Sequence, residues 1–383
     1  MATITRAQRP SLTLIAALLA AAGTAHAADF KAGEWDLSLG GIVNAYYTHT
    51  SCSGSQAVGG LALASQALGC GGSSGRTVIG NGLLPNALTT TAKTRQEGID
   101  IGATLMIGAA VASGDAISNN SNVDVRQGFF TFGTADMGTV KLGRDYGLFG
   151  ATAILGDMTL IGAGAPVSAT QRNRVTLGHI GSGYTYLGTY GQLAYSLPTS
   201  GGFSATVALM SPVDASGTSF TGRNSPQLQA LATVAFGGGK AWLGAKSQKF
   251  EGPANTGFTM NGVELGASVT AGALGLSANL QSGKGLGVLS DGDSGNRKQT
   301  NVLLQATWQA TAKTKLGLNW GESRLKDGAA ADLRSNSNVT AGLYYGLTKS
   351  VTLVGELSRT RSQPVVGEAA RMNGVALGGI VFF

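Results

Sequence analysis

The feature that most constrains this chain is the alternation of apolar and polar residues with a period of two. In segment 301–309, Val302 and Leu304 belong to an apolar set that occupies every second position, with polar residues between them. Segments 99–111 and 314–321 show the same pattern. Successive side chains of a β-strand point to opposite faces of the sheet, so this period predicts strands through much of the chain.

Alternation alone also fits a soluble β-sandwich or a β-helix, but the connections between the segments argue against both. In the C-terminal half, short turns lie near 199–201, 237–239, 272–273, 311–313 and 348–350. Long polar connections alternate with them, near 215–225, 251–258, 284–298, 326–335 and 363–370. Short turns on one rim and long loops on the other are typical of an outer-membrane β-barrel.

The predicted strands can be counted back from the C-terminus. Clear patterns lie near 371–383, 351–362, 336–347, 314–325, 299–310, 273–283, 259–271, 240–250, 226–236, 202–213, 183–197, 138–145, 122–132, 98–111 and 34–48. Single-chain bacterial barrels have even strand counts, so one more strand is expected, between 86 and 97. The fold class predicted is therefore an all-β transmembrane antiparallel barrel of 16 strands that encloses water.

The N-terminus reads as an export signal. Arg6 and Arg9 precede an apolar run over 12–22, and Ala25-His26-Ala27 follows it. This order predicts a signal peptide over 1–27 that is cleaved after Ala27, leaving 28–383 as the barrel. An N-terminal anchor that stays uncleaved is the alternative. No apolar run of the length of a membrane helix, about 20 residues, follows it.

Composition excludes several protein classes. A hydrophobic share of 43% is too high for a disordered chain, and 60 Gly without a Gly-X-Y period exclude collagen. Only 12% of residues are charged, about half the usual share. An outward face in lipid accounts for that deficit. The net charge of +7 falls to +5 without the two signal-peptide arginines, which is far from a nucleic-acid signature.

Three places in the chain are similar to a known family. Trp35–Tyr46 looks like a first barrel strand, and Val125–Phe130 with Gly138–Arg144 looks like the paired strands before a constriction loop. The chain also ends in Phe383 behind alternating apolar residues. On these residues it resembles the general porins of Gram-negative bacteria, especially the sixteen-stranded trimeric type of β-proteobacteria.

The resemblance implies a passive outer-membrane channel for small hydrophilic solutes, exported through the periplasm. It implies a homotrimer, contact with lipopolysaccharide, and Phe383 as a C-terminal signal for the barrel assembly machinery. It also places a constriction loop, 145–172, inside the barrel, and a long first external region at 49–94. The family's Pro-Glu-Phe-Gly turn is absent from the loop, which leaves pore size and substrate preference open.

Charges facing each other across the constriction are how such pores discriminate ions. The acidic candidates are Asp157 and, second, Asp145, although either could instead cap a short helix or face bulk water. The basic candidates are Arg126, Arg144, Lys141, Arg95, Arg172 and Arg174. Alternation turns Arg126 and Lys141 toward the lumen, because a charge facing lipid would cost about 2–4 kcal/mol. The basic majority predicts a preference for anions.

The remaining reactive residues are few. Cys52 and Cys70 share the first long loop, and export through an oxidising compartment predicts a disulfide between them rather than a metal site. His49 and His179 lie on different elements, and no nucleophile elbow or phosphate-binding glycine motif accompanies them. The sequence therefore predicts no enzyme, no metal and no cofactor.

Three other functions stay open at this point. A substrate-specific channel for organic anions would need basic or aromatic ladders along the lumen. A barrel-mounted adhesin would use the long first external region as its binding surface. An enzyme at the rim would depend on His49 and His179.

Overall fold

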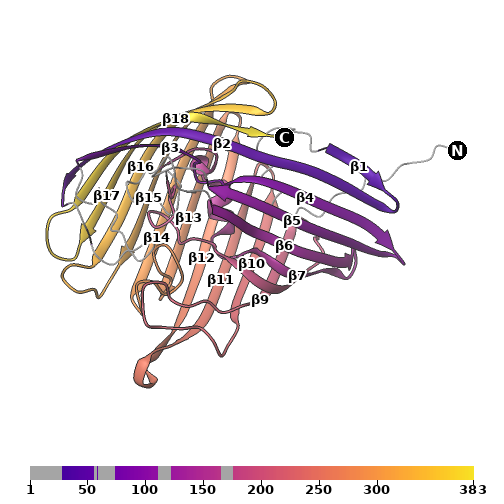
Figure 1. The fold of residues 1–383 in the computed structure, drawn as a ribbon, viewed down its shortest axis with the longest axis horizontal. Helices are drawn as coiled ribbons and strands as arrows, with labels where there is room; N and C mark the ends of the chain where they lie inside the picture. Colours follow the sequence, from indigo (N-terminus) through magenta and orange to yellow (C-terminus); the bar gives the residue numbers. More distant parts are fainter. Residues whose placement is uncertain (1–27, 56–57, 59–73, 111–121, 165–175) are drawn as a thin grey trace.

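The computed structural model describes residues 28–55, 58, 74–110, 122–164 and 176–383. Its strands form a closed antiparallel barrel with a wall of 16 strands, which confirms the predicted fold class (Figure 1). The wall strands are β2 (Trp35–Gly54), β4 (Asn86–Gln96), β5 (Ile99–Ala110), β6 (Asn122–Thr134), β7 (Gly138–Tyr146), β8 (Thr189–Ser196), β9 (Phe203–Met210), β10 (Gln227–Phe236), β11 (Gly239–Glu251), β12 (Gly257–Ala271), β13 (Leu274–Lys284), β14 (Lys298–Gln309), β15 (Thr314–Leu325), β16 (Leu333–Gly346), β17 (Val351–Pro364) and β18 (Ala370–Phe382).

Two short strands complete the wall around β2. β1 (Ala28–Ala32) pairs with the start of β2, and β18 pairs with the rest of the same edge. On the other edge, β3 (Gly75–Gly80) pairs with the later part of β2, and β4 pairs with its start. The barrel closes where Phe383 N–H donates to Gly41 O at 3.1 Å and Gly41 N–H donates to Phe383 O at 2.7 Å.

The additional strand expected between 86 and 97 is β4, and the chain breaks away from the wall just before it, between β3 and β4. At 81–85 the chain leaves the ladder, and Asn44 of β2 takes over the lost pairing. Its Oδ1 accepts Gly82 N–H at 2.8 Å and its Nδ2 donates to Leu84 O at 3.2 Å. The first external region is therefore shorter than the predicted 49–94, because β2 continues to Gly54 and β3 and β4 occupy much of the remainder.

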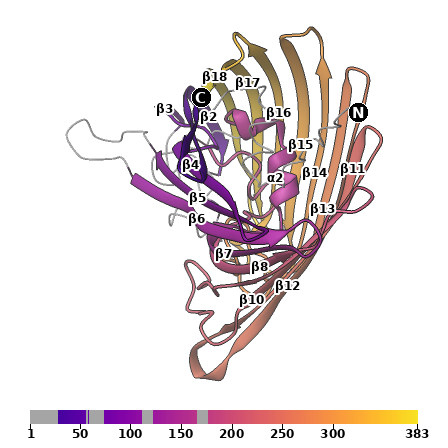
Figure 2. The same cartoon turned by 90° about the vertical axis from the view of Figure 1, so that its right-hand side faces the viewer.

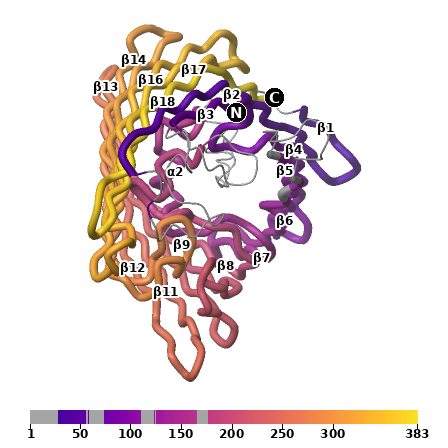
Figure 3. The backbone as a smooth tube through the Cα atoms, turned by 60° about the vertical axis from the view of Figure 1, so that its left-hand side comes forward, coloured from indigo at the N-terminus to yellow at the C-terminus, as the bar shows by residue number. Residues whose placement is uncertain are grey.

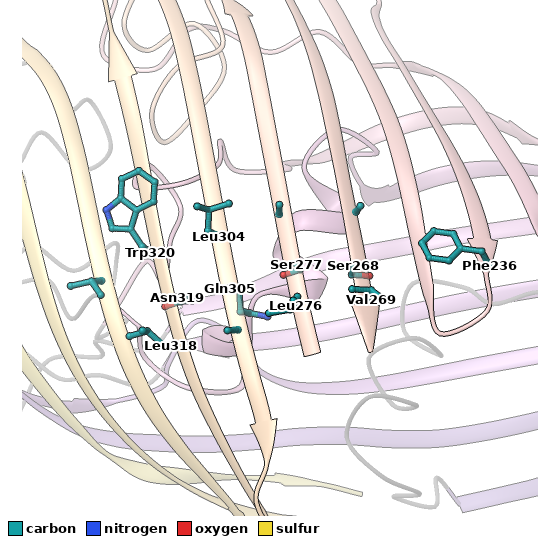
Figure 4. Close-up of a pocket in the computed structure, with 14 residues that line it drawn as sticks. Phe236, Ser268, Val269, Leu276, Ser277, Leu304, Gln305, Leu318, Asn319 and Trp320 are labelled. Carbon is teal, nitrogen blue, oxygen red and sulfur yellow. The ribbon is translucent and has the colours of Figure 1, made fainter. Parts of the chain in front are cut away.

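The two faces of the wall follow the sequence alternation. Figure 4 shows part of the outer face, where Phe236, Leu304 and Trp320 are 50%, 47% and 40% exposed. Polar residues between such positions, for example Asn301 and Asn319, point inward and are buried. The apolar outer face suits contact with lipid, and the polar inner face lines a lumen.

Helical structure is confined to connections. The helix α2 (Ala151–Gly156) and the 3-10 turn η2 (Met158–Ile161) follow β7, and the 3-10 turn η3 (Pro253–Asn255) follows β11. None of the helices in the described part of the chain is long and apolar enough to cross a membrane.

Candidate functional site

The connection between β7 and β8 lies inside the barrel. It runs over 147–188, carries α2 and η2, and is therefore longer at its C-terminal end than the predicted loop of 145–172. Figures 2 and 3 show α2 within the ring of strands, on the side of β12–β15. We call 147–188 the lumen loop. Residues 165–175 of it lie outside the described part of the chain.

Wall side chains hold the lumen loop by accepting its backbone N–H groups. Gln229 Oε1 accepts from Leu148 at 2.7 Å and Phe149 at 2.8 Å. The other contacts run from Gly150 to Glu264 Oε2 (2.7 Å), from Met158 to Gln305 Oε1 (2.7 Å), from Ala163 and Gly164 to Glu356 Oε2 (2.8 and 2.6 Å), and from Thr185 to Gln281 Oε1 (2.9 Å). A coil inside a barrel has no ladder partner for its N–H groups, so these acceptors satisfy what would be costly to leave unpaired.

Asp157 lies on the lumen loop, as predicted, but it does not face the passage. It is 3% exposed and begins η2, where its Oδ1 accepts Thr159 N–H at 2.9 Å. Its carboxylate also accepts from Tyr184 Oη at 2.7 Å and from Asn319 Nδ2 at 3.0 Å, while His179 Nδ1 lies 3.4 Å away. Burial favours the neutral carboxyl group, but His179 and the donated hydrogen bonds outweigh burial and lower the pKa of Asp157.

Asp145 and Lys141 come together on the inner face of β7, beside Gln127 of β6. Asp145 accepts from Gln127 Nε2 at 2.7 Å and forms an ion pair with Lys141 Nζ. Lys141 also lies over the Phe129 ring, 4.9 Å from its centroid. Arg126 is buried at a register shift of β6. The structure thus joins one predicted acid, Asp145, and one predicted base, Lys141, on the same wall, rather than placing them on opposite sides of a pore.

Arg144 and Arg95 do not reach a constriction. Arg144 pairs across β7 and β8 with Gly191, in the outward set that includes Leu142, and donates to Val125 O and Thr189 Oγ1. The prediction for Arg144 is wrong because a strand's alternation turns it to the opposite face from Asp145. Arg95 is exposed near the end of β4, where it pairs with Asp100 of β5 at 3.2 Å.

Other predicted residues fall partly outside the described residues. Arg172, Arg174 and Cys70 lie there, so their placements stay predictions. Cys52 is disulfide-bonded. His49 contacts Thr77 Oγ1 on an exposed strand face, whereas His179 is buried in the lumen loop. Among the described residues, no cluster of His, Cys, Asp or Glu could hold a metal ion.

A second connection, 285–297 between β13 and β14, also folds inward, which sequence reasoning missed. Leu286, Val288 and Leu289 are at most 2% exposed. Asp291 forms a buried ion pair with Lys246 of β11, and Tyr190 Oη and Gln227 Nε2 donate to Asp291 Oδ2 at 2.9 and 2.8 Å. The apolar run within an otherwise polar loop is the signal that could have revealed it.

The described lumen contains cations that no acid neutralises. Lys240 and Lys315 are inward residues near the short-turn ends of β11 and β15, and neither forms an ion pair within the described residues. Each lies near an aromatic ring, Lys240 at 5.9 Å from the Trp242 centroid and Lys315 at 5.2 Å from that of Tyr344. Their strand positions alone predict an inward orientation, but not their lack of partners.

The comparisons with known proteins agree with this architecture. A family model described as Gram-negative porin matches residues 13–363. No curated protein sequence matches the chain significantly. Among solved structures, the outer membrane channel DcaP of Acinetobacter baumannii has a TM-score of 0.71 at 16% identity, covering 93% of this chain and 100% of that one.

Two further structures share the fold. The anion-selective porin of Comamonas acidovorans has a TM-score of 0.62 at 18% identity, covering 91% of this chain and all of that one. The trimer form of OmpT from Vibrio cholerae has a TM-score of 0.55 at 10% identity, covering 91% of this chain and 99% of that one.

Proposed function

The chain belongs to the Gram-negative porin family, whose members are outer-membrane channels for passive diffusion, and on that premise we propose that it passes small hydrophilic solutes with a preference for anions. The observation that supports anion preference is that acidic side chains of the lumen are buried and hydrogen-bonded, whereas two lysines of the lumen have no acidic partner among the described residues. Glu264 and Glu356 are buried and accept backbone N–H groups of the lumen loop. Lys240 and Lys315 remain without ion pairs in the described residues.

Because the acids are buried and the two lysines are unpaired in the described part of the chain, the electrostatic potential along the passage should be positive. Asp157 and Asp291 lie on the two inward loops and are likewise buried, so little of their charge reaches water in the lumen. The unpaired lysines attract anions at close range and repel cations. The similar fold of the Comamonas anion-selective porin accords with this sign. Passive diffusion along such a path needs no cofactor and no catalytic group, and we propose that the protein is not an enzyme.

The test is the reversal potential of single channels in a planar bilayer under a KCl gradient. We expect reversal toward the chloride potential for the wild type. Replacing both Lys240 and Lys315 by Gln should move it toward the potassium potential, because the unpaired lumen charge is removed. Arg324→Gln is the matched control, since Arg324 points outward and pairs with Glu322. Wild-type reversal toward the potassium potential contradicts the proposal.

We also propose that the channel assembles as a homotrimer, as the family and the trimeric form of the Vibrio protein suggest. Cross-linking in native membranes, followed by gel electrophoresis, would reveal three protomers. Phe383 is proposed as the signal read by the barrel assembly machinery; its deletion should lower the amount of assembled barrel.

Lipopolysaccharide is the proposed lipid partner. Arg361 of β17 lies directly opposite Arg371 of β18 near the long-loop rim, on the outer face. Arg371 pairs with Glu368 at 3.5 Å and Arg361 donates to Gln363 Oε1 at 2.7 Å, so one carboxylate faces two cations. Like charges directly opposite on paired strands are destabilising, and an anionic headgroup would add a second counter-charge. Replacing both by Gln should reduce the lipopolysaccharide that copurifies with the barrel.

A further inference from the structure

A cavity of about 210 Å³ lies between the lumen loop and the inner wall of β11–β14. Thr152 and Gly156 of α2 form one side of it. Lys240, Trp242, Asn279 and Gln305 are among the wall residues that form the other. The space is large enough to hold several waters. It therefore suits a small solute in contact with the wall.

The cavity's polar groups combine one cation with neutral hydroxyl and amide groups that can donate and accept hydrogen bonds. Lys240 supplies a cation, and no carboxylate is among the described residues that line the cavity. Hydroxyl groups of Thr152, Ser277 and Thr307 also line it. A charged donor without a neighbouring acid favours a ligand with negative charge.

Asn279 adds an unsatisfied donor. Its side chain is 3% exposed, and Trp242 Nε1–H donates to its Oδ1 at 3.1 Å. An indole N–H can only donate, so this bond determines which end of the amide is the oxygen. The Nδ2 group is then a buried donor that has no partner in the described residues. Such a group is costly to leave unpaired, which points to an acceptor arriving from outside the protein.

We propose that this cavity is a binding subsite for a small aliphatic carboxylate in transit, whose oxygens accept from Lys240 and Asn279. The proposal rests on the proposed channel function and deepens it by naming a solute class. The Trp242 ring gives the carbon chain an apolar contact beside the charged group. Binding at one charged site in an otherwise hydrated lumen must be weak enough for release into the next compartment.

The experiment measures single-channel conductance against concentration for sodium butyrate, with sodium chloride as the comparison salt. We expect butyrate conductance to saturate at lower concentration than chloride conductance in the wild type. Lys240→Gln should raise the half-saturating butyrate concentration by about tenfold or more, because a charge-assisted hydrogen bond is lost. Lys240→Arg keeps a cationic donor and should restore most of the saturation.

Two further variants separate the subsite from general lumen charge. Lys315→Gln removes an inward lysine beside an aromatic ring but outside this cavity, so it should lower anion preference and leave the half-saturating concentration within about twofold. A Cβ on Gly156 meets no atom within 4 Å. Gly156→Val therefore occupies cavity space without altering charge and should weaken saturation as Lys240→Gln does.

Each outcome discriminates between the proposals. Butyrate conductance that rises in parallel with chloride conductance overturns the subsite and leaves an anion-preferring channel intact. An equal effect of Lys240→Gln and Lys315→Gln also overturns it, because the lysine charge alone would then account for the result. Absence of conductance, or cation preference in KCl, instead overturns the proposed function itself.

Discussion

Replacing Asp291 by Asn should release the connection 285–297 from the lumen while the barrel stays folded. Asp291 and Lys246 form an ion pair in which both side chains are 1% exposed. Removing one partner of a buried pair costs about 3–5 kcal/mol, because the other charge stays buried without compensation. The connection is the element free to move, since β13 and β14 are held by their ladders.

The magnitude follows from that cost. At about 1.4 kcal/mol for each tenfold change, the ratio of released to seated loop should rise by about two to four orders of magnitude. The double variant Lys246→Met with Asp291→Asn removes both charges and keeps an unbranched chain over the Phe149 ring, now 4.9 Å from Lys246 Nζ. Replacing both members of a buried pair is often nearly neutral, so the double variant should recover most of the seated state.

Hydrogen exchange of the detergent-solubilised protein, followed by mass spectrometry, measures this directly. Amides of 285–297 should lose protection in Asp291→Asn, while those of β13 serve as the internal reference. Single-channel conductance should rise, because a released loop no longer occupies lumen space. Hydrogen exchange of 285–297 within about threefold of the wild type would refute the idea that the Asp291–Lys246 ion pair holds this connection in the lumen. A double variant as unprotected as Asp291→Asn would refute the charge argument.

Two other perturbations test the lumen loop and the lipid face. The lowered pKa of Asp157 means that its stabilisation is complete above the ordinary value of about 3.9 and is lost as pH falls through the lower folded value. Conductance should therefore show a change below about pH 4 that depends on Asp157, whose carboxylate faces His179 and Tyr184. The same acid response in Asp157→Asn would contradict this. Leu265 is 59% exposed on the outer face of β12, so Leu265→Arg should destabilise the barrel by about 2–4 kcal/mol. Urea unfolding in lipid vesicles measures this change in the free energy of unfolding. A change below about 0.5 kcal/mol would argue against lipid contact at this position.

The wall of this protein could be predicted from the sequence because alternation is a local property. β12–β18 begin and end within about three residues of the predicted segments, since each strand carries its own two-faced pattern. The break at 81–85 could not be predicted, because Asn44 compensates for it from another strand. β1 was missed because its few residues carry too little pattern.

Which charged side chains remain available to a solute in the lumen could be learned only from the tertiary structure. Lys141 was predicted to face the lumen from its strand pattern, yet only the fold pairs it with Asp145. Asp157 lies on the predicted loop, but it is buried and accepts hydrogen bonds from Thr159 and Tyr184 of the same loop. The alternation of a strand specifies which residues face inward. Which inward charges remain available to a solute depends on where distant loops settle, because burial and hydrogen bonding by those loops decide whether each charge reaches water.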